Sequence, residues 1–203
     1  MNFEQFYKLK DKVLNGSGDS DKHLLTLYSI AISMKSKNIL ELGVRGGSTT
    51  LPLLLAAKEN GGSLVSVDIE DTEFTPDDKQ LSKIWTFKKQ DALEYLAGLE
   101  EKLFLDLVYI DDWHSYEHVK RELELLDKHI LPDGIILLHD LMYGGTEPNY
   151  HADLSNDKGQ WASGGPYRAV CELDKNFWEF STIPVNNGLT ILRKKYSSKY
   201  KRN

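Results

Sequence analysis

Two acidic residues that follow apolar runs are the clearest sign of chemistry in this 203-residue sequence. Asp111 comes directly after Leu105–Ile110, and Asp140 comes two residues after Ile135–Leu138. If these runs are neighbouring parallel strands, their backbones lie roughly 4.8 Å apart and both carboxylates face one crevice. Two negative charges that close require a proton or a cation between them. The pair predicts a divalent cation such as Mg²⁺, which carboxylate oxygens suit; alternatively, Asp111 contacts only a cofactor and Asp140 caps a loop.

Histidines next to these acids are candidates for a general base. His114 lies in the segment that leaves the first apolar run, and imidazole takes up a proton near neutral pH. His139, directly before Asp140, is the second candidate base, and as a ligand it is softer than Mg²⁺ prefers. The alternative for each is a structural hydrogen bond. His118, one helical turn beyond His114, is expected at the surface.

A glycine-containing turn follows the apolar run Asn38–Leu42. A dinucleotide site requires the pattern G-x-G-x-x-G, and here Arg45 occupies the second glycine position; a P-loop is also absent. Glu41 would repel a pyrophosphate but suits a ligand with an amine or a sulfonium, and S-adenosylmethionine has both. The alternative is a turn that only packs a helix. The candidate cofactor-binding residues of this turn are Glu41, Gly43, Arg45, Gly46, Gly47 and Ser48.

Acids also stand at the ends of other predicted strands. Asp68 closes the second apolar run, where a carboxylate would accept hydrogen bonds from ribose hydroxyls. Asp91 follows the third run and either binds the adenine amino group or caps the next helix. Asp111, after the fourth run, is a cofactor-binding candidate as well as a metal ligand. Together these positions predict a nucleoside cleft at one edge of a sheet.

The elements that must position these residues alternate along the chain. Five apolar strands are predicted at Asn38–Leu42, Leu64–Asp68, Thr86–Lys89, Leu105–Ile110 and Ile135–Leu138, the last after a turn at Pro132–Gly134. Helices are predicted at Phe3–Leu14, Asp21–Met34, Ser48–Lys58, Pro76–Ile84, Ala92–Leu99, Ser115–Lys128 and from Pro166 to about Asn176. Two further strands, Glu179–Ile183 and Leu189–Arg193, form a hairpin with an Asn-Gly turn. The pattern predicts an α/β fold: a Rossmann-like, doubly wound, seven-stranded sheet of five parallel strands and an antiparallel hairpin, with helices on both faces.

We expect a single domain over residues 1–203. Its expected parts are N-terminal helices (1–35), a cofactor-binding half (36–140), a lid or acceptor loop (141–165), a helix with the terminal hairpin (166–194) and a basic tail (195–203). Long connections of this kind are commonly binding loops. Tyr143, Tyr150 and Trp161 are therefore candidates to line an acceptor pocket, unless the loop is a disordered excursion.

Composition narrows the classes of partner. Lysine and arginine total 25 against 31 acidic residues, a net charge of −6, which disfavours nucleic-acid binding. The single cysteine, Cys171, cannot form an intrachain disulfide, and the sequence has neither a membrane-spanning run nor a signal peptide. These observations predict a cytoplasmic protein that binds neither nucleic acid nor membranes. They leave self-association into a homo-oligomer open.

The motifs over about residues 36–193 resemble class I S-adenosylmethionine-dependent methyltransferases. The segment from Ile110 to Tyr116 and the pair His139-Asp140 are similar to the Ile-Asp-Gly-x-His-x-Tyr and His-Asp patterns of small-molecule O-methyltransferases in the macrocin O-methyltransferase and cephalosporin-hydroxylase-like group. The resemblance implies methylation of a hydroxyl by S-adenosylmethionine, assisted by a cation at Asp111 and Asp140. Metal-dependent relatives add a third oxygen ligand beside the second acid, which this sequence does not offer.

Other functions remain as alternatives at this stage. A cofactor-binding module without catalysis would share the glycine turn but would not need His114 or the paired acids. A nicotinamide-dependent oxidoreductase is disfavoured by Arg45 and Glu41. A nucleic-acid amino-methyltransferase would carry an Asp/Asn-Pro-Pro-Tyr signature, which is absent after the fourth predicted strand.

Overall fold

The computed structural model describes residues 1–142 and 165–195. One sheet contains seven strands in the order β3-β2-β1-β4-β5-β7-β6. Neighbouring strands from β1 to β5 are parallel, whereas β7 runs antiparallel to both β5 and β6. The strands are β1 (Asn38–Leu42), β2 (Ser63–Asp68), β3 (Trp85–Lys89), β4 (Leu105–Ile110), β5 (Ile130–His139), β6 (Trp178–Ile183) and β7 (Leu189–Lys194). The predicted fold class is confirmed.

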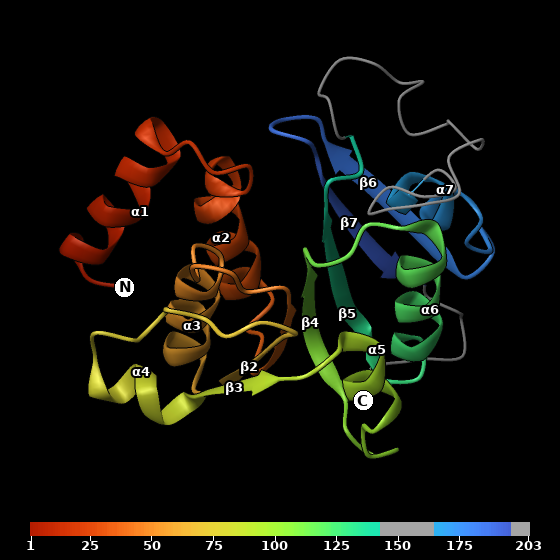
Figure 1. Cartoon of the computed structure of the whole chain (residues 1–203), viewed down its shortest axis with the longest axis horizontal. Helices are drawn as coiled ribbons and strands as arrows, with labels where there is room; N and C mark the ends of the chain where they lie inside the picture. Colours follow the sequence, from red (N-terminus) through yellow and green to blue (C-terminus); the bar gives the residue numbers. More distant parts are fainter. Residues whose placement is uncertain (143–164, 196–203) are drawn as a thin grey trace.

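Helices cover both faces of this sheet (Figure 1). The described helices are α1 (Phe3–Asn15), the 3₁₀ turn η1 (Asp21–His23), α2 (Leu24–Ser33), α3 (Thr50–Asn60), α4 (Lys79–Ile84), α5 (Ala92–Ala97), α6 (Tyr116–Leu126) and α7 (Gly165–Cys171). Helices α1 to α4 lie on one side of the sheet and α5 to α7 on the other (Figure 1). The sheet is therefore a central layer that is buried from both sides.

The central strands are apolar because both of their faces are covered. Leu40 and Leu42 of β1 pack in the same hydrophobic cluster as α5 and α6, whereas Ile39 packs in the cluster of α2 and α3. Tyr109 of β4 is fully buried and belongs to the α2–α3 side. Alternation along β4 therefore sends the side chains of residues 109 and 111 toward the same side of the sheet.

Strand register brings the predicted functional segments together. Leu42 of β1 lies beside Ile110 of β4, and Ile110 lies beside Leu138 of β5. The residues that follow these three positions consequently meet at one edge of the sheet. Because β2 lies on one side of β1 and β4 on the other, this edge is also where the strand order reverses, the usual place for a ligand in such sheets.

Two local predictions are corrected. Pro132–Gly134, predicted as a turn, lies inside β5, which begins at Ile130. The pairing of β4 with β5 shifts register between Leu105 and Leu107, and such a bulge accommodates a proline inside a strand. The helix predicted from Pro76 begins only at Lys79, after an N-cap residue whose carboxylate accepts the amide of the second helical residue.

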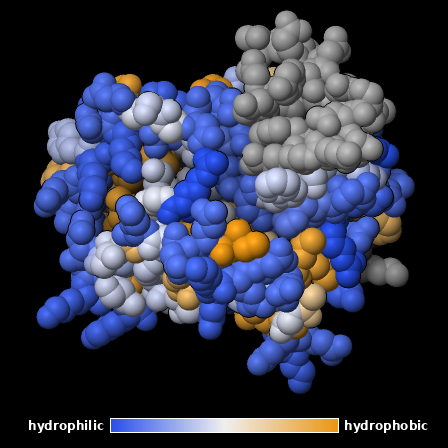
Figure 2. Space-filling view, in the orientation of Figure 1, coloured by the Kyte–Doolittle hydropathy of each residue, from blue (hydrophilic) through white to orange (hydrophobic). Residues whose placement is uncertain are grey.

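The outer surface is mostly hydrophilic, and its apolar groups form small separate spots in the view of Figure 2. In the described ranges, no helix has both the length and the hydrophobicity to cross a membrane. Most of the predicted acceptor loop, residues 143–164 with Tyr143, Tyr150 and Trp161, lies outside the described residues, as does most of the predicted basic tail.

Candidate active site

The turn after β1 has a backbone that requires glycine at two positions. Gly43 has φ +87°, and a Cβ there would lie 2.2 Å from the carbonyl oxygen of Asp111. Gly47 has φ +72°, and a Cβ there would lie 2.4 Å from the Phe74 ring. At Gly46 no described atom lies within 4 Å of such a Cβ. The turn therefore packs tightly against β4 and Phe74, while Gly46 borders open space.

Asp68, at the end of β2, holds this turn in place. Its Oδ2 accepts hydrogen bonds from the backbone amides of Val44, at 2.7 Å, and Arg45, at 3.0 Å. Its Oδ1 accepts the amide of Glu70 at 2.9 Å. Arg45 has φ +46°, and its exposed guanidinium lies 3.8 Å from Asp19 Oδ2. Asp68 and the glycine turn after β1 are thus joined by hydrogen bonds.

Two adjoining cavities line the edge of the sheet beside this turn. The larger, about 590 Å³, is bordered by the ends of β2, β3 and β4, and the smaller, about 220 Å³, by residues 18–21 and the glycine turn. Gly43, Arg45 and Asp111 border both. Of the predicted cofactor residues, the larger cavity includes Asp68 and Asp91, and the smaller includes Gly46 and Ser48. The two cavities form a cleft of the size of a small-molecule site.

Asp91 has one of its two predicted roles, that of a helix cap, and its position leaves the other open. Its Oδ1 accepts the amide of Glu94 at 3.0 Å and so caps α5, and the residue also borders the larger cavity. Trp113, which the sequence analysis did not select, borders the same cavity with 48% of its surface exposed. An exposed aromatic ring at this place offers a face on which a flat base can stack.

Glu41 lies elsewhere than the sequence analysis expected. It is fully buried beneath the turn and borders neither cavity. Its Oε1 accepts a hydrogen bond from Thr49 Oγ1 at 2.7 Å, and its Oε2 accepts from Thr50 Oγ1 at 2.8 Å and Ser66 Oγ at 2.6 Å. Burial raises the pKa of Glu41 to about 7, against the opposing effect of these hydroxyls. Glu41 therefore anchors the start of α3 to β1 and β2 and does not face a ligand.

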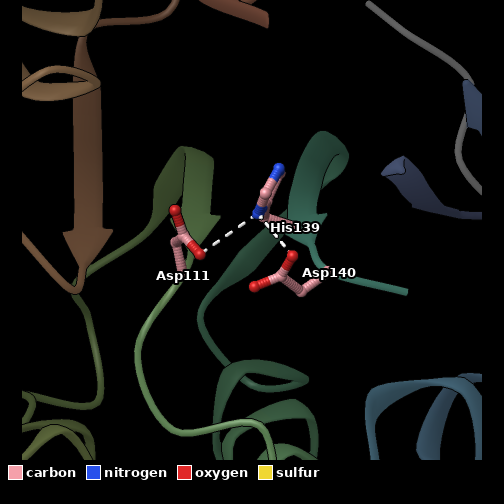
Figure 3. A group of neighbouring side chains, drawn as sticks. All are labelled: Asp111, His139 and Asp140. Carbon is pink, nitrogen blue, oxygen red and sulfur yellow. Dashed lines mark ion pairs between the residues drawn. The ribbon is translucent and has the colours of Figure 1, made fainter. Parts of the chain in front are cut away.

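Three titratable side chains meet where β4 and β5 end (Figure 3). His139 Nδ1 lies 3.3 Å from Asp111 Oδ1 and 3.1 Å from Asp140 Oδ1. One ligand atom from each residue lies within 4.8 Å of those of the others. We call Asp111, His139 and Asp140 the strand-end cluster. Asp140 has φ +62°, a strained conformation of the kind that gathers at functional sites.

Hydroxyl groups orient Asp111 within this cluster. Its Oδ2 accepts hydrogen bonds from Ser20 Oγ at 2.7 Å and Tyr109 OH at 2.9 Å, so Oδ1 is the atom that faces His139. Burial acts to raise the pKa of Asp111, but hydrogen bonds and charge from His114 and His139 outweigh it and hold that pKa well below its usual range. Asp111 is therefore a carboxylate at neutral pH.

The hairpin between β6 and β7 orients His139. His139 Nε2 lies 3.1 Å from the carbonyl oxygen of Asn186, which can only accept, so this nitrogen carries a proton. Nδ1 consequently faces the two carboxylates. Burial acts to lower the pKa of His139, but the hydrogen bonds and charges of Asp111 and Asp140 outweigh it and raise the pKa to about 10.

His114, the first candidate base, reaches the same place from the segment after β4. Its Nε2 lies 3.1 Å from Asp140 Oδ2 and 3.5 Å from Asp111 Oδ1, and the residue is 4% exposed. The structure thus brings together all four residues that the sequence analysis selected for catalysis or metal binding.

The strand-end cluster fits a divalent cation. His139 Nδ1 and Asp140 Oδ1 are buried and have no hydrogen-bond partner of good geometry among the described residues. Neighbouring ligands of an octahedral ion bound at about 2.1 Å are separated by about 3.0 Å, close to the observed 3.1 and 3.3 Å. His139, considered from the sequence as a base and as a ligand softer than Mg²⁺ prefers, offers a third donor atom where the sequence has no third oxygen ligand.

A second cluster of the same composition lies beside the larger cavity. His118 Nε2 is 3.1 Å from Asp112 Oδ2 and 3.6 Å from Glu122 Oε1. We call these three residues the helix cluster, because His118 and Glu122 are one turn apart on α6. His118 is not at the surface as expected: its side chain is 14% exposed. Burial acts to lower its pKa, but Asp112 and Glu122 raise it to about 10.

Some supporting residues had no local signal in the sequence. Ser20 and Tyr109 bond Asp111 from η1's N-cap position and from within β4, and Asn186 bonds His139 from the hairpin. His23, left out of the sequence analysis, packs edge-on against His139 at 5.4 Å between ring centres, and its Nε2 lies 3.3 Å from the same Asn186 carbonyl. Only the i, i+4 spacing of the helix cluster was readable in advance.

Comparisons with known proteins agree with this fold. The structure resembles the O-methyltransferase TomG from Streptomyces achromogenes, involved in tomaymycin synthesis and solved with S-adenosylmethionine, with TM-score 0.67 and 15% identity over 97% of this chain and 92% of that chain. It also resembles the methyltransferase PaMTH1 from Podospora anserina bound to S-adenosylhomocysteine, with TM-score 0.64 and 18% identity over 97% and 89% of the two chains. An O-methyltransferase from Bacillus cereus with S-adenosylhomocysteine gives TM-score 0.64 and 17% identity over 95% and 89%. No curated protein matches the sequence.

The sheet order and the glycine turn beside a strand-end cleft define a class I methyltransferase, the class that uses S-adenosylmethionine. A family model described as a methyltransferase domain matches residues 40–141, half of the sequence. The chain belongs to this family of methyltransferase domains.

Proposed function

We propose that this protein transfers the methyl group of S-adenosylmethionine to a hydroxyl oxygen of a small molecule, with a divalent cation held by Asp111, His139 and Asp140. One observation supports the proposal above the others: His114 and His139 adjoin Asp111, which borders both cavities of the cleft. A cofactor in this cleft would therefore lie against a group that can accept a proton.

The cleft supplies the positioning that methyl transfer requires. The turn held by Asp68 receives the nucleoside end of the cofactor, with Asp91 and Trp113 bordering the place of the base. The smaller cavity, bordered by Ser48 and Asp111, receives the amino-acid end with its amine and sulfonium. Fixing the donor in this way supplies much of the rate, because the reaction needs an aligned nucleophile more than covalent help.

His114 removes the proton of the acceptor hydroxyl. Its Nε2 lies within hydrogen-bonding reach of Asp140, so the imidazolium formed after proton transfer is stabilised by a neighbouring negative charge. As the bond from oxygen to the methyl carbon forms, the bond from that carbon to sulfur breaks. The positive sulfonium thereby becomes the neutral thioether of S-adenosylhomocysteine.

The strand-end cluster is the place for the cation. Asp111 Oδ1, His139 Nδ1 and Asp140 Oδ1 would hold it. When bound, a divalent cation supplies a positive charge that lowers the pKa of a hydroxyl coordinated to it. Ser20 and Tyr109 keep Asp111 aimed at this position through its other oxygen.

Binding of S-adenosylhomocysteine tests the cofactor part of the proposal by calorimetry. We expect Asp68→Ala to weaken binding at least about tenfold, since two charge-assisted hydrogen bonds to the turn are lost. Asp106→Ala is the matched control. Asp106 Oδ2 also accepts two backbone amides, from Lys37 at 2.8 Å and Asn38 at 2.7 Å, but at the opposite edge of the sheet.

Equal weakening by the two variants, or no binding to the native chain at millimolar concentration, would contradict the proposal. The oxygen preference is tested with isotopically labelled methyl donor and paired phenol and aniline acceptors. Transfer to the amines at the expense of the hydroxyls would overturn it.

A further inference from the structure

We infer that the strand-end cluster selects a first-row transition ion, such as Mn²⁺ or Co²⁺, over Mg²⁺, and that His139 is the residue that sets this preference. The inference deepens the proposed function, because it rests on the cation site proposed there.

The donor atoms are the first reason. Two carboxylate oxygens suit Mg²⁺, Ca²⁺ and Mn²⁺ alike, so Asp111 and Asp140 discriminate little between them. Imidazole nitrogen binds first-row transition ions with an affinity that rises from Mn²⁺ to Co²⁺ and beyond, whereas Mg²⁺ exchanges its water for nitrogen reluctantly. His139 is the central member of the cluster, since its Nδ1 lies within 3.3 Å of both carboxylates. An ion that binds both carboxylates therefore meets this nitrogen as well.

The orientation of the imidazole is the second reason. The Nε2 proton of His139 is directed at the Asn186 carbonyl, so Nδ1 is the ring nitrogen that faces the two carboxylates and the position of the proposed ion. A hydrogen bond from the opposite ring nitrogen to a backbone carbonyl also makes the ligating nitrogen more basic. His139 is completely buried, which prevents the ring from turning away toward water.

The hairpin that carries this carbonyl is itself fixed. Asn186 Nδ2 donates to the carbonyl oxygen of Asp19 and, at 3.3 Å, to that of Gly18. The same segment supplies Ser20, which bonds Asp111. One set of hydrogen bonds thus aims both the nitrogen and one oxygen of the cluster, and an ion binds without reorganising them.

Binding of Mn²⁺, Co²⁺ and Mg²⁺ to the native chain and to His139→Asp, measured by calorimetry, tests the inference. The native chain is expected to bind Co²⁺ and Mn²⁺ at least about a hundredfold more tightly than Mg²⁺, and the substitution should lower the Co²⁺-to-Mg²⁺ affinity ratio at least about tenfold. Pulsed electron paramagnetic resonance of bound Mn²⁺ should show modulation from a directly coordinated nitrogen, which disappears in the variant.

Two further variants keep this test decisive. His139→Asn supplies a neutral side chain without the nitrogen ligand, in case three adjacent carboxylates prevent folding, and should also lose the nitrogen signal. His114→Asn is the matched control, because it removes the other imidazole near Asp140 and should keep the signal and the affinity ratio within about threefold. A nitrogen signal that disappears in His114→Asn but persists in the His139 variants would overturn the inference.

Binding of S-adenosylhomocysteine, measured on the same samples, separates this inference from the proposed function. If S-adenosylhomocysteine binds but the ions bind without preference, the inference fails and the proposed methyl transfer stands. The same conclusion holds if S-adenosylhomocysteine binds and no ion does. If S-adenosylhomocysteine does not bind to the native chain, the proposed function fails regardless of the ion affinities.

Discussion

The strand-end cluster and the helix cluster contain the same groups, two carboxylates and one imidazole, yet they are supported differently. In the strand-end cluster, Asp111 and His139 each use a second atom to bond Ser20, Tyr109 or Asn186, so one atom of each is directed at a common point. In both clusters one imidazole nitrogen approaches both carboxylates. In the helix cluster, however, Asp112 Oδ1 and both oxygens of Glu122 are buried without a hydrogen-bond partner of good geometry among the described residues.

This difference indicates different roles for the two clusters. Hydrogen bonds from other residues aim atoms of the strand-end cluster at a common point, as the proposed ion would require. The carboxylates of the helix cluster depend on His118 itself for a polar partner. Glu122 is fully buried and has no hydrogen bond of good geometry to the described residues, so His118 is the positive charge beside it. Residue types and short distances alone would describe both as metal sites, and only the outer hydrogen bonds distinguish them.

The largest expected effect separates the clusters by stability. His118→Ala should lower the free energy of unfolding by about 3–5 kcal/mol at pH 8, because it leaves a buried carboxylate without its positive partner. Urea denaturation measures this loss. Adding Glu122→Gln should restore more than half of it, since the unpaired charge is then removed. A cost below about 1 kcal/mol for His118→Ala would show that the helix cluster is not a structural ion pair.

A third buried carboxylate, Glu41, extends the comparison to a site with hydroxyl partners in place of an imidazole. Its pKa in the folded chain is raised from 4.5 to about 7, so the folded state binds more protons than the unfolded state between these values. Stability from this group is therefore fully present below about pH 4.5 and is lost as the pH rises through 7. We expect the loss to reach about 3 kcal/mol and to be absent in Glu41→Gln, and urea denaturation between pH 5 and 8 measures it. Parallel pH profiles for the two proteins would contradict this account.

Neighbouring aspartates provide a sharper test of ion binding. Asp111→Asn should weaken Mn²⁺ binding about a hundredfold, equivalent to about 2.7 kcal/mol, because one of the three proposed ligands loses its charge. Asp112→Asn changes the adjacent residue, in the helix cluster, and should alter Mn²⁺ affinity less than about threefold. Calorimetry with both variants measures the difference. An equal effect of the two substitutions would remove the distinction between the clusters.

The smallest expected effect concerns His23. His23→Phe keeps an aromatic ring against His139 but removes one of the two donors to the Asn186 carbonyl. We expect a loss of about 1 kcal/mol in the free energy of unfolding and a change below about threefold in Mn²⁺ affinity. A larger loss of affinity would mean that His23 takes part in ion binding, and calorimetry would detect it.

The fold and the cleft were predictable because their signals are local. Predominantly apolar runs gave the bounds of β1 and β4 without error, since strands buried on both faces are rich in apolar residues. Acids that follow such runs lie at one edge of a parallel sheet whatever the details of packing. For this reason Asp68, Asp91, Asp111 and Asp140 could be placed from their spacing.

The remaining features depend on tertiary contacts, which the spacing of residues along the sequence does not reveal. The direction of His139 is set by the Asn186 carbonyl, which belongs to a hairpin 47 residues away. The burial of Glu41 depends on Thr49 and Thr50 turning their hydroxyls beneath the strand at the start of α3. Both are side-chain orientations that result from tertiary packing and not from periodicity.

The shared carbonyl of Asn186 has a consequence for how the protein is made. It joins His23 and Asn186, which are separated by 163 positions, and such distant contacts form late because a long loop of chain must close first. A nascent chain that ends before Asn186 already contains the glycine turn and every acid of the cleft, but it lacks the carbonyl that orients His139. If the strand-end cluster binds the proposed ion, its tight binding is therefore expected only after the hairpin between β6 and β7 has folded.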